Sequence, residues 1–254
     1  MADDDTGPAS PTESPALRIR EPPKVLVPVE VLEGQSVSTQ LVEFLAPAEV
    51  VLLGYHVLPE QTPTEQASMQ FEDRARGAVD DIAEAFREAG REVETRVVFT
   101  HDRDATVDRV AAEADVTAVL LPNPVADVAD VLVPIRGAID AGRLADLVAT
   151  LLADSRGAVT LWGIDTGGEF DAAAAVDRAR GTLLDRGLAA DRVRTEVSES
   201  DAPARAVIER SPEFDVIVMG ESGPDLLSLL LGDPAERVAE GAVAPVLVVR
   251  ERSG

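Results

Sequence analysis

The part of this sequence best suited to hold a charged ligand is a glycine-rich segment near its end. An apolar run at 216–219 leads into Gly-Glu-Ser-Gly at 220–223. Eight residues separate Gly223 from Gly232, where a second helical pattern begins. Glycines let the backbone approach a ligand, and the free N–H groups at a helix start favour negative charge. The segment therefore predicts an anion site, and its residues are Gly220, Ser222, Gly223 and Gly232.

A carboxylate stands where that second helix begins. Asp233 is followed by Pro234, which is the usual arrangement of an N-cap residue and a first helical residue. In this interpretation the Asp233 carboxylate occupies the N–H groups that a phosphate would otherwise use. A phosphate about 4 Å away would then meet a repulsion of about 1–4 kcal/mol. Binding would need Mg²⁺ or Arg136 to neutralise the acid.

Two further polar residues near this segment have two interpretations each. Arg136 follows the apolar run 131–135 and could contact an anionic ligand in bidentate fashion. It could equally form an internal ion pair with Asp233 or Glu221. Ser222 could donate to a phosphate, or it could serve only the glycine turn. We include Arg136 and Asp233 among the candidate binding residues.

Other residues that could do chemistry do not form a recognisable set. The chain has no cysteine, which excludes disulfides, thiolate ligands and thiol nucleophiles. His56 and His101 are isolated from each other, and we interpret both as structural. The aspartates at 102, 104 and 108 lack the glycine and bidentate Glu of a calcium loop, so a helix start is the better interpretation. We expect no catalytic residues, no metal site and no enzymatic activity, and we expect Trp162 in the core.

The elements that position these residues occur twice. Val-Leu-Val-Pro at 25–28 recurs at 131–134, and the run at 50–54 matches that at 159–163. Short β-branched runs without in–out alternation indicate strands buried on both faces of a parallel sheet. Between them lie helical patterns, such as 71–89, with Gly90 as its stop. The second copy shows strands near 131–135, 159–164, 193–197, 214–219 and 246–250, a helix at 172–184, and Gly187 soon after it.

The repeats predict an α/β fold of two tandem open parallel-sheet domains. After the fourth strand of the first copy, at 117–121, only a few residues precede the second copy. No glycine loop, last helix or last strand fits there. The predicted boundaries are a disordered acidic tail at 1–22, a degenerate domain at 23–129 and a complete domain at 130–254. A ligand is expected at the carboxyl ends of the strands.

Composition limits the partners and the compartment. The formal net charge is −24, with an isoelectric point near 4.3, and Lys24 is the only lysine. Such an acidic, lysine-poor surface suits a halophilic cytoplasm, although a merely acidic mesophilic protein fits as well. It disfavours nucleic acid and anionic lipid. No apolar run is long enough for a membrane span, and the first residues do not resemble a signal peptide, so we expect a cytoplasmic protein.

These motifs together resemble the universal stress protein family. The resemblance rests on the Val-Leu-Val-Pro strand, on Tyr-His-Val at 55–57, on the tandem arrangement and on the segment from Gly220 to Val249. It implies an adenine-nucleotide alpha-hydrolase-like fold. Members that bind ATP carry the loop G-x2-G-x9-G-[S/T] and an Asp at the end of the first strand. Here the second spacing is eight, Asp233 replaces Ser or Thr, and Glu30 and Arg136 stand at the Asp positions.

The resemblance implies a cytoplasmic stress-response regulatory protein. We expect it to act through an unidentified protein partner, with no cofactor or with ATP bound only weakly. The alternative is an ATP or AMP sensor that uses the loop from Gly220 to Gly232.

The last strand predicts the oligomeric state. Family members commonly pair their last strands across a dimer, and an unpaired strand edge invites another strand. Because the first copy has no fifth strand, Val246–Val249 has no internal equivalent to meet. We therefore expect a homodimer through this strand. The alternative is a monomer in which part of the first domain covers the edge.

Overall fold

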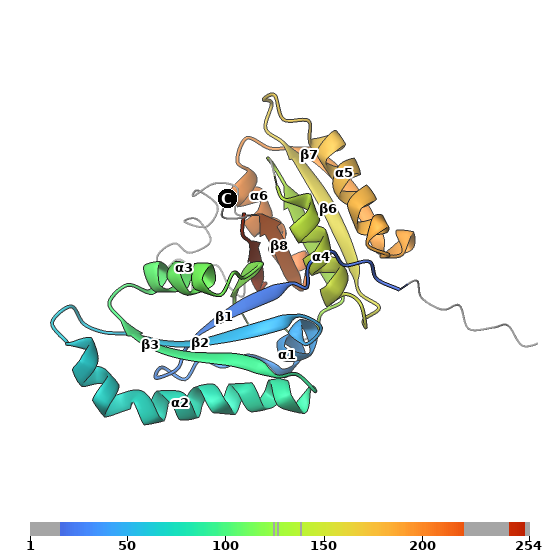
Figure 1. The fold of residues 1–254 in the computed structure, drawn as a ribbon. Coiled ribbons are helices and arrows are strands. Elements are labelled where there is room, and N and C mark those ends of the chain that lie inside the picture. Colours follow the sequence, from blue (N-terminus) through green and yellow to red (C-terminus); the bar gives the residue numbers. More distant parts are fainter. Residues whose placement is uncertain (1–15, 124, 126, 138, 221–243, 252–254) are drawn as a thin grey trace, which may run out of the picture.

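The computed structural model describes residues 16–123, 125, 127–137, 139–220 and 244–251. They form a nine-stranded sheet with helices on both faces (Figure 1). The strands are β1 (Lys24–Glu30), β2 (Glu49–Val57), β3 (Val93–Thr100), β4 (Ala118–Leu121), β5 (Asp130–Ile135), β6 (Ala158–Asp165), β7 (Val193–Glu199), β8 (Val216–Gly220) and β9 (Val246–Val249). The helices are α1 (Thr39–Leu45), α2 (Thr64–Glu88), α3 (Arg103–Glu113), α4 (Ala141–Leu151), α5 (Ala172–Asp185), α6 (Pro203–Arg210) and the 3₁₀ turns η1 (Ala190–Arg192) and η2 (Ser211–Glu213).

The sheet consists of two parallel groups of strands that meet at one antiparallel pairing. Its order is β3-β2-β1-β4-β9-β8-β5-β6-β7. Strands β1 to β4, the first half, are parallel to one another, and β5 to β9, the second half, are parallel to one another. The first four strands of each half follow the same order. The predicted α/β fold with open parallel sheets is therefore confirmed, and the described residues between β4 and β5 hold no further helix or strand.

The position of β9 corrects the predicted dimer interface. β9 pairs with β8 on one side and antiparallel with β4 on the other, where Val119 lies opposite Val248. Both of its edges are used within the chain, so it offers no edge to a second copy. The prediction that Val246–Val249 forms a dimer interface is wrong. The reason is that β4, although short, is long enough to pair with all four residues of β9.

Apolar side chains fill both faces of the sheet. Helices α1, α2, α4 and α5 cover one face with a core that is continuous across both halves. On the other face α3 packs over the first half and α6 over the second, each with a smaller core. Trp162 lies in the α6 core, as predicted, and is 5% exposed. Core residues at the centre of the sheet include Leu26, Leu52, Leu120, Leu132, Ile217 and Leu247.

Two glycines allow helices to approach the sheet closely. A Cβ at Gly54 in β2 would collide with Val79 of α2 and lie 2.9 Å from a Val31 methyl. A Cβ at Gly163 in β6 would lie 2.9 Å from Val176 of α5. Because these glycines occupy matching positions in the two halves, the repeat seen in the sequence is also a repeat of helix-on-strand contacts. Helix α2 begins seven residues earlier than the periodicity from Phe71 indicated.

The chain start differs from the predicted disordered tail of residues 1–22. The residues from 16 onward are placed against the second half before the chain enters β1. The boundary was misjudged because Pro and charged residues at 18–23 resemble a tail in composition. Residues 1–15 lie outside the described part.

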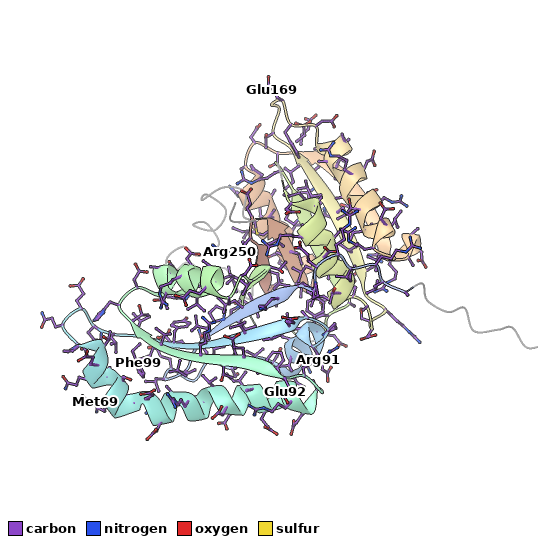
Figure 2. All side chains as sticks on the ribbon, viewed as in Figure 1. Met69, Arg91, Glu92, Phe99, Glu169 and Arg250 are labelled. Carbon is purple, nitrogen blue, oxygen red and sulfur yellow. The ribbon has the colours of Figure 1, made fainter. Side chains whose placement is uncertain are left out.

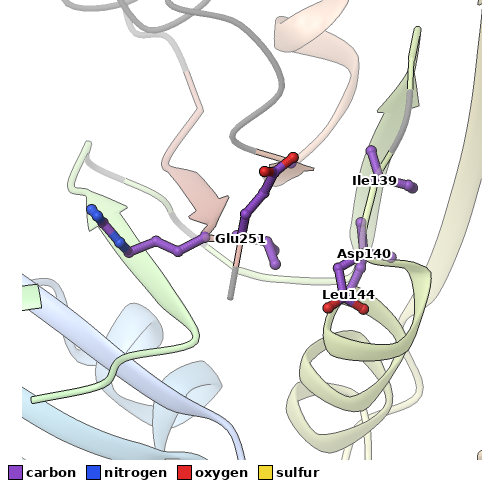
Figure 3. Close-up of a pocket in the computed structure, with 7 residues that line it drawn as sticks. Ile139, Asp140, Leu144 and Glu251 are labelled. Carbon is purple, nitrogen blue, oxygen red and sulfur yellow. The ribbon is translucent and has the colours of Figure 1, made fainter. Parts of the chain in front are cut away.

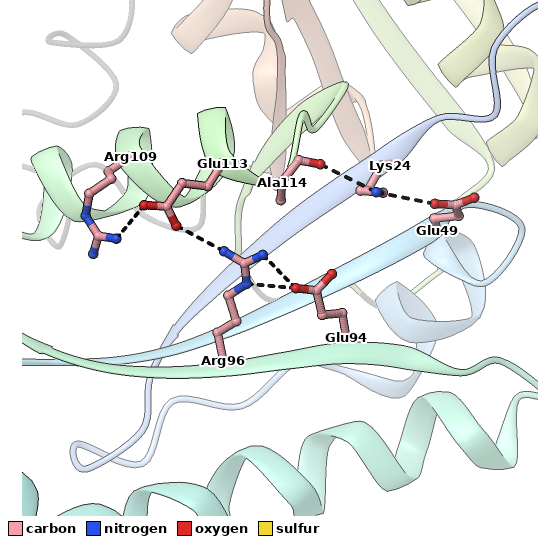
Figure 4. Close-up of polar contacts among 7 residues, drawn as sticks. All are labelled: Lys24, Glu49, Glu94, Arg96, Arg109, Glu113 and Ala114. Atoms are coloured by element: carbon pink, nitrogen blue, oxygen red, sulfur yellow. Dashed lines mark hydrogen bonds and ion pairs between the residues drawn. The ribbon is translucent and has the colours of Figure 1, made fainter.

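The surface carries ion pairs in which one arginine serves more than one acid. On the first half, Arg96 contacts Glu94 at 2.7 Å and Glu113 at 3.3 Å, and Arg109 contacts Glu113 at 2.9 Å (Figure 4). Such exposed pairs typically contribute about 0.2–1 kcal/mol each. They offset only part of the repulsion within a chain of net charge −24.

Within the described residues, no helix is long and apolar enough to cross a membrane.

Candidate functional site

The structure places two of the predicted binding residues at the carboxyl ends of neighbouring strands, on one side of the sheet that is called this edge below. Arg136 directly follows β5, and Gly220 is the last residue of β8. These strands are parallel neighbours with Val131 opposite Val216, so both residues lie at the same level. The other predicted binding residues, Ser222, Gly223, Gly232 and Asp233, lie outside the described residues, as does Glu221.

A small cavity opens at this edge. Its volume is about 10 Å³, room for about one water molecule, and the surrounding space of about 230 Å³ includes open solvent. Its walls come from the first turn of α4, the end of β8 and the end of β9 (Figure 3). The lining residues are Ile139, Asp140, Leu144, Gly220, Val249, Arg250 and Glu251.

The helix start beside the cavity is already capped by a carboxylate. Asp140 is the N-cap of α4, and its Oδ1 accepts a hydrogen bond from the Arg143 amide at 3.0 Å. A phosphate approaching this helix start would meet a negative charge and an amide already in use. The sequence predicted this arrangement at Asp233, which lies outside the described residues, and the N-cap at Asp140 was not predicted. The signal was available, since an Asp stands just before the helical spacing of Leu144, Leu147 and Leu151.

The arginine at the cavity is engaged elsewhere. Arg250 donates from Nη1 to Asp108 of α3 at 2.9 Å, and from its backbone amide to the Thr117 carbonyl at 2.9 Å. It therefore lies where the two halves meet (Figure 2). The charged residues that line the cavity are thus two acids, Asp140 and Glu251, and one arginine that pairs with an acid of the first half.

A buried arginine joins the halves beneath this edge. Arg143 of α4 is 7% exposed. It donates from Nη2 to the Val116 carbonyl at 3.1 Å and from Nη1 to the Arg250 carbonyl at 3.3 Å. These bonds hold the start of β4 and the end of β9 against α4. They fix the backbone on which Arg250 and Glu251 stand.

The corresponding residues of the first half lie at the opposite edge of the sheet. Because β4 and β9 are antiparallel, the carboxyl ends of the two halves face opposite ways. Glu30 therefore cannot complete a site with Arg136. Glu30 Oε1 lies 3.8 Å from Nδ1 of His56, and Nε2 of His101 lies 2.9 Å from the Thr62 carbonyl. Both histidines have structural contacts at this edge.

The aspartates near 102 serve separate roles. Asp102 is the N-cap of α3 and accepts from the Ala105 amide at 3.0 Å. Asp104 contacts Arg103, and Asp108 contacts Arg250. In the part of the chain that the structure describes, no three His, Cys, Asp or Glu side chains come together as metal ligands.

Comparison with known proteins finds a family match for the second half of the chain. Residues 129–250 match the model described as "Universal stress protein family". Among curated proteins, none matches the chain.

Solved structures extend the likeness to the fold of the whole chain. A universal stress protein from Archaeoglobus fulgidus DSM 4304 superposes with a TM-score of 0.61 at 15% identity, covering 91% of this chain and 97% of that one. A universal stress protein in complex with cAMP matches 48% of this chain and 97% of its own, with 23% identity and a TM-score of 0.37. A putative universal stress protein from Pseudomonas aeruginosa UCBPP-PA14 has 14% identity and a TM-score of 0.45, covering 89% and 92%. The first of these shows that the two-half arrangement has a counterpart of nearly the same extent.

Proposed function

We propose, on the premise that residues 129–250 match the universal stress protein family, that this chain is a stress-response regulatory protein of the cytoplasm. It acts by association with another protein, and it binds ATP weakly or not at all. The observation that carries this proposal is the negative charge at the carboxyl ends of β8 and β9. Asp140 caps α4 there and Glu251 stands beside it, while Arg250 pairs with Asp108.

The mode of action follows from the weakness of the nucleotide site. A regulator that senses no nucleotide must exert its effect through contacts with another macromolecule. The net charge of −24 disfavours nucleic acid and anionic lipid, which carry the same sign. A protein partner is therefore expected.

One arrangement favours the alternative, an adenine-nucleotide sensor. Arg136 and Gly220 lie at the same edge as the cavity, and an arginine beside a glycine-ended strand suits a phosphate. In this alternative ATP or AMP would use Gly220, Gly223 and Gly232, with Arg136 or Mg²⁺ offsetting the acids.

Calorimetric titration of the full chain with Mg-ATP in molar KCl tests the proposal. We expect no saturable binding at micromolar ATP. A dissociation constant in the low micromolar range would establish the sensor and contradict weak binding. Mass spectrometry of the intact complex, purified in high salt, reports the partner and any nucleotide together. A protein bound without nucleotide is expected, whereas one nucleotide per chain and no protein would support the sensor.

A further inference from the structure

The first described residues form a strap on the second half. The strap is the segment 16–23, which has no regular secondary structure, bends at residues 20 and 21, and crosses beside α4 and α5 before the chain enters β1 (Figure 1). The Arg18 amide donates to the Arg186 carbonyl at 2.9 Å, and the Arg20 amide donates to Oδ1 of Asp146 at 3.1 Å. Leu17 and Ile19, which alternate with these arginines, are half-buried. Alternate residues thus face the second half, as in a docked extended peptide.

The anchor of the strap is a buried ion pair. Asp146 of α4 and Arg186, the C-cap of α5, are each 3% exposed, and Nε of Arg186 donates to the Asp146 carboxylate. A buried carboxylate is costly unless its oxygens receive further hydrogen bonds. The Arg20 amide supplies one to the same Oδ1 that Arg186 contacts. The Asp146 carboxylate therefore loses one hydrogen bond when the strap is not docked.

The second half leaves room for the strap at one glycine. Gly187 has a φ of +97°, in the left-handed region that favours glycine. A Cβ there would lie 3.2 Å from the Ala16 carbonyl oxygen and 3.5 Å from Cα of Leu17. Gly187 therefore both ends the turn after α5 and admits the strap.

The anchor also lies close to the first turn of α4. Nη2 of Arg186 lies 3.9 Å from where a Cβ of Gly142 would stand, and Asp140 Oδ1 lies 3.2 Å from the same point. Gly142 is in the first turn of α4, next to the N-cap that lines the cavity. Movement of Arg186 would therefore reach the first turn of α4.

We propose that residues 16–23 are a releasable clasp that, when docked, completes the Asp146–Arg186 pair and holds the first turn of α4 rigid. Residues 16–20 attach to the second half through two backbone hydrogen bonds and two half-buried apolar side chains. Glu21 makes a further contact, and Pro23 is buried and accepts a hydrogen bond from the Glu49 amide of the first half at 3.0 Å. Segments held by so few contacts open without global unfolding. Release would expose the ion pair to water and loosen the helix start at the cavity.

Hydrogen exchange of the full-length chain, followed by mass spectrometry in molar KCl, tests the clasp. Arg20→Pro removes the amide that binds Asp146, whereas Arg20→Ala removes the same side chain and keeps the amide. We expect Arg20→Pro to speed exchange of the amides at 17–19 and of the first turn of α4 by about tenfold, because a hydrogen bond to a charged group is lost. Amides of β5 and β6 should stay as slow as in the parent, and Arg20→Ala should match the parent.

Two results would overturn the clasp. Strap amides that exchange in the parent as slowly as those of β5 would show that the strap opens only with the whole fold. Strap exchange that is the same in Arg20→Pro and Arg20→Ala would show that Asp146 does not anchor it. Asp146→Asn gives a second measurement from the other side of the bond, and equal strap exchange in that variant and the parent would also contradict the proposal.

Discussion

Val119 of β4 and Val248 of β9 lie opposite each other in the antiparallel pairing that joins the two halves. In the described residues the first half has no fifth strand, and β9 of the second half lies directly beside β4 instead. The edge that would otherwise recruit a second chain is thus used inside the molecule.

Val248→Pro should therefore destroy the fold. A proline in an interior strand removes a ladder hydrogen bond and costs about 3 kcal/mol or more. We expect most of the cooperative thermal transition in circular dichroism to disappear.

Val248→Thr serves as the control, since it keeps the amide and the β-branched shape. It should retain a transition at a moderately lower midpoint. A Val248→Pro protein that kept the parent's midpoint would show that β9 does not lie inside the sheet.

Two glycine-to-alanine changes should have opposite effects on the free energy of unfolding. At Gly54 an added methyl meets Val79 and Val31, and overpacking of this kind costs about 1–3 kcal/mol. At Gly77, within α2, the methyl meets nothing within 4 Å, and alanine stabilises a helix by about 1 kcal/mol over glycine. Urea unfolding at constant KCl measures both. Equal effects at the two positions would contradict the close packing of α2 on β2.

Arg192→Lys should weaken the loop that follows α4. Arg192 donates from Nε to the Gly157 carbonyl at 2.7 Å and from Nη2 to the Leu152 carbonyl at 2.8 Å. Burial lowers the pKa of this guanidinium, and the Asp191 carboxylate acts in the other direction. Lysine keeps the charge but cannot donate to both carbonyls as the planar guanidinium does. We therefore expect a loss of about 1–3 kcal/mol in the free energy of unfolding.

Arg194→Lys is the matched control for that change. Arg194 is only two residues away, yet it is exposed and makes a surface ion pair with Asp130. Its replacement should change the stability by less than about 0.5 kcal/mol. Urea unfolding followed by fluorescence of the lone tryptophan, Trp162, compares the two variants. Similar losses in both would show that the partly buried hydrogen bonds of Arg192 contribute nothing.

Salt should stabilise the protein. The Debye length falls from about 30 Å at 0.01 M to about 3 Å at 1 M, which screens the repulsion of a −24 chain. Screening also weakens surface pairs such as Arg96–Glu113, but these contribute too little to reverse the sign. The thermal midpoint should climb as KCl rises from tens of millimolar to molar.

A variant with fewer charges gives the control for salt. Asp73, Asp80 and Asp81 are exposed on α2. Changing all three to Asn should raise the midpoint in dilute buffer more than in molar KCl. A midpoint that does not respond to KCl would remove the halophilic interpretation.

Removing the cap charge at the cavity should improve ATP binding. Asp140→Ser keeps a capping hydroxyl but eliminates a carboxylate whose repulsion of a phosphate costs about 1 kcal/mol or more, which is about fivefold in affinity. Asp102→Ser is the control, because it changes the N-cap of α3. The calorimetric titration with Mg-ATP should show tighter binding for Asp140→Ser alone. Unchanged affinity would mean that the cavity is not where phosphate approaches.

The same reasoning applies to Asp233, which lies outside the described residues. Asp233→Ser should raise ATP affinity if that carboxylate is the block, and binding no better than the parent's would exclude it.

Local sequence patterns predicted most of the helices and strands, because apolar runs and helix-ending glycines act within a single segment of the chain. The apolar runs located β1, β2, β5 and β6, and Gly90 and Gly187 end their helices with positive φ. What failed depends on contacts between distant segments. The partner of β9 is set by the closure of the whole sheet, and the docking of residues 16–23 depends on Asp146 and Arg186, which are buried only after α4 and α5 pack.

The candidate site was predicted less completely than the fold. Arg136 and Gly220 were predicted at the ends of two strands, where the structure also places them, since strand ends can be located from apolar runs. Asp140, Arg250 and Glu251 were missed. Arg250 and Glu251 resemble a polar chain end in the sequence, and only the antiparallel join brings Arg250 to Asp108.

The antiparallel pairing of β4 with β9 also sets an order of events during translation. The ribosome releases β1 to β4 well before it makes β9, which is the last of the described strands. Throughout that interval the nascent first half presents an unpaired β4 edge, a surface that chaperones hold and that aggregation exploits. The half that is synthesised first therefore waits longest for the strand that completes the whole sheet.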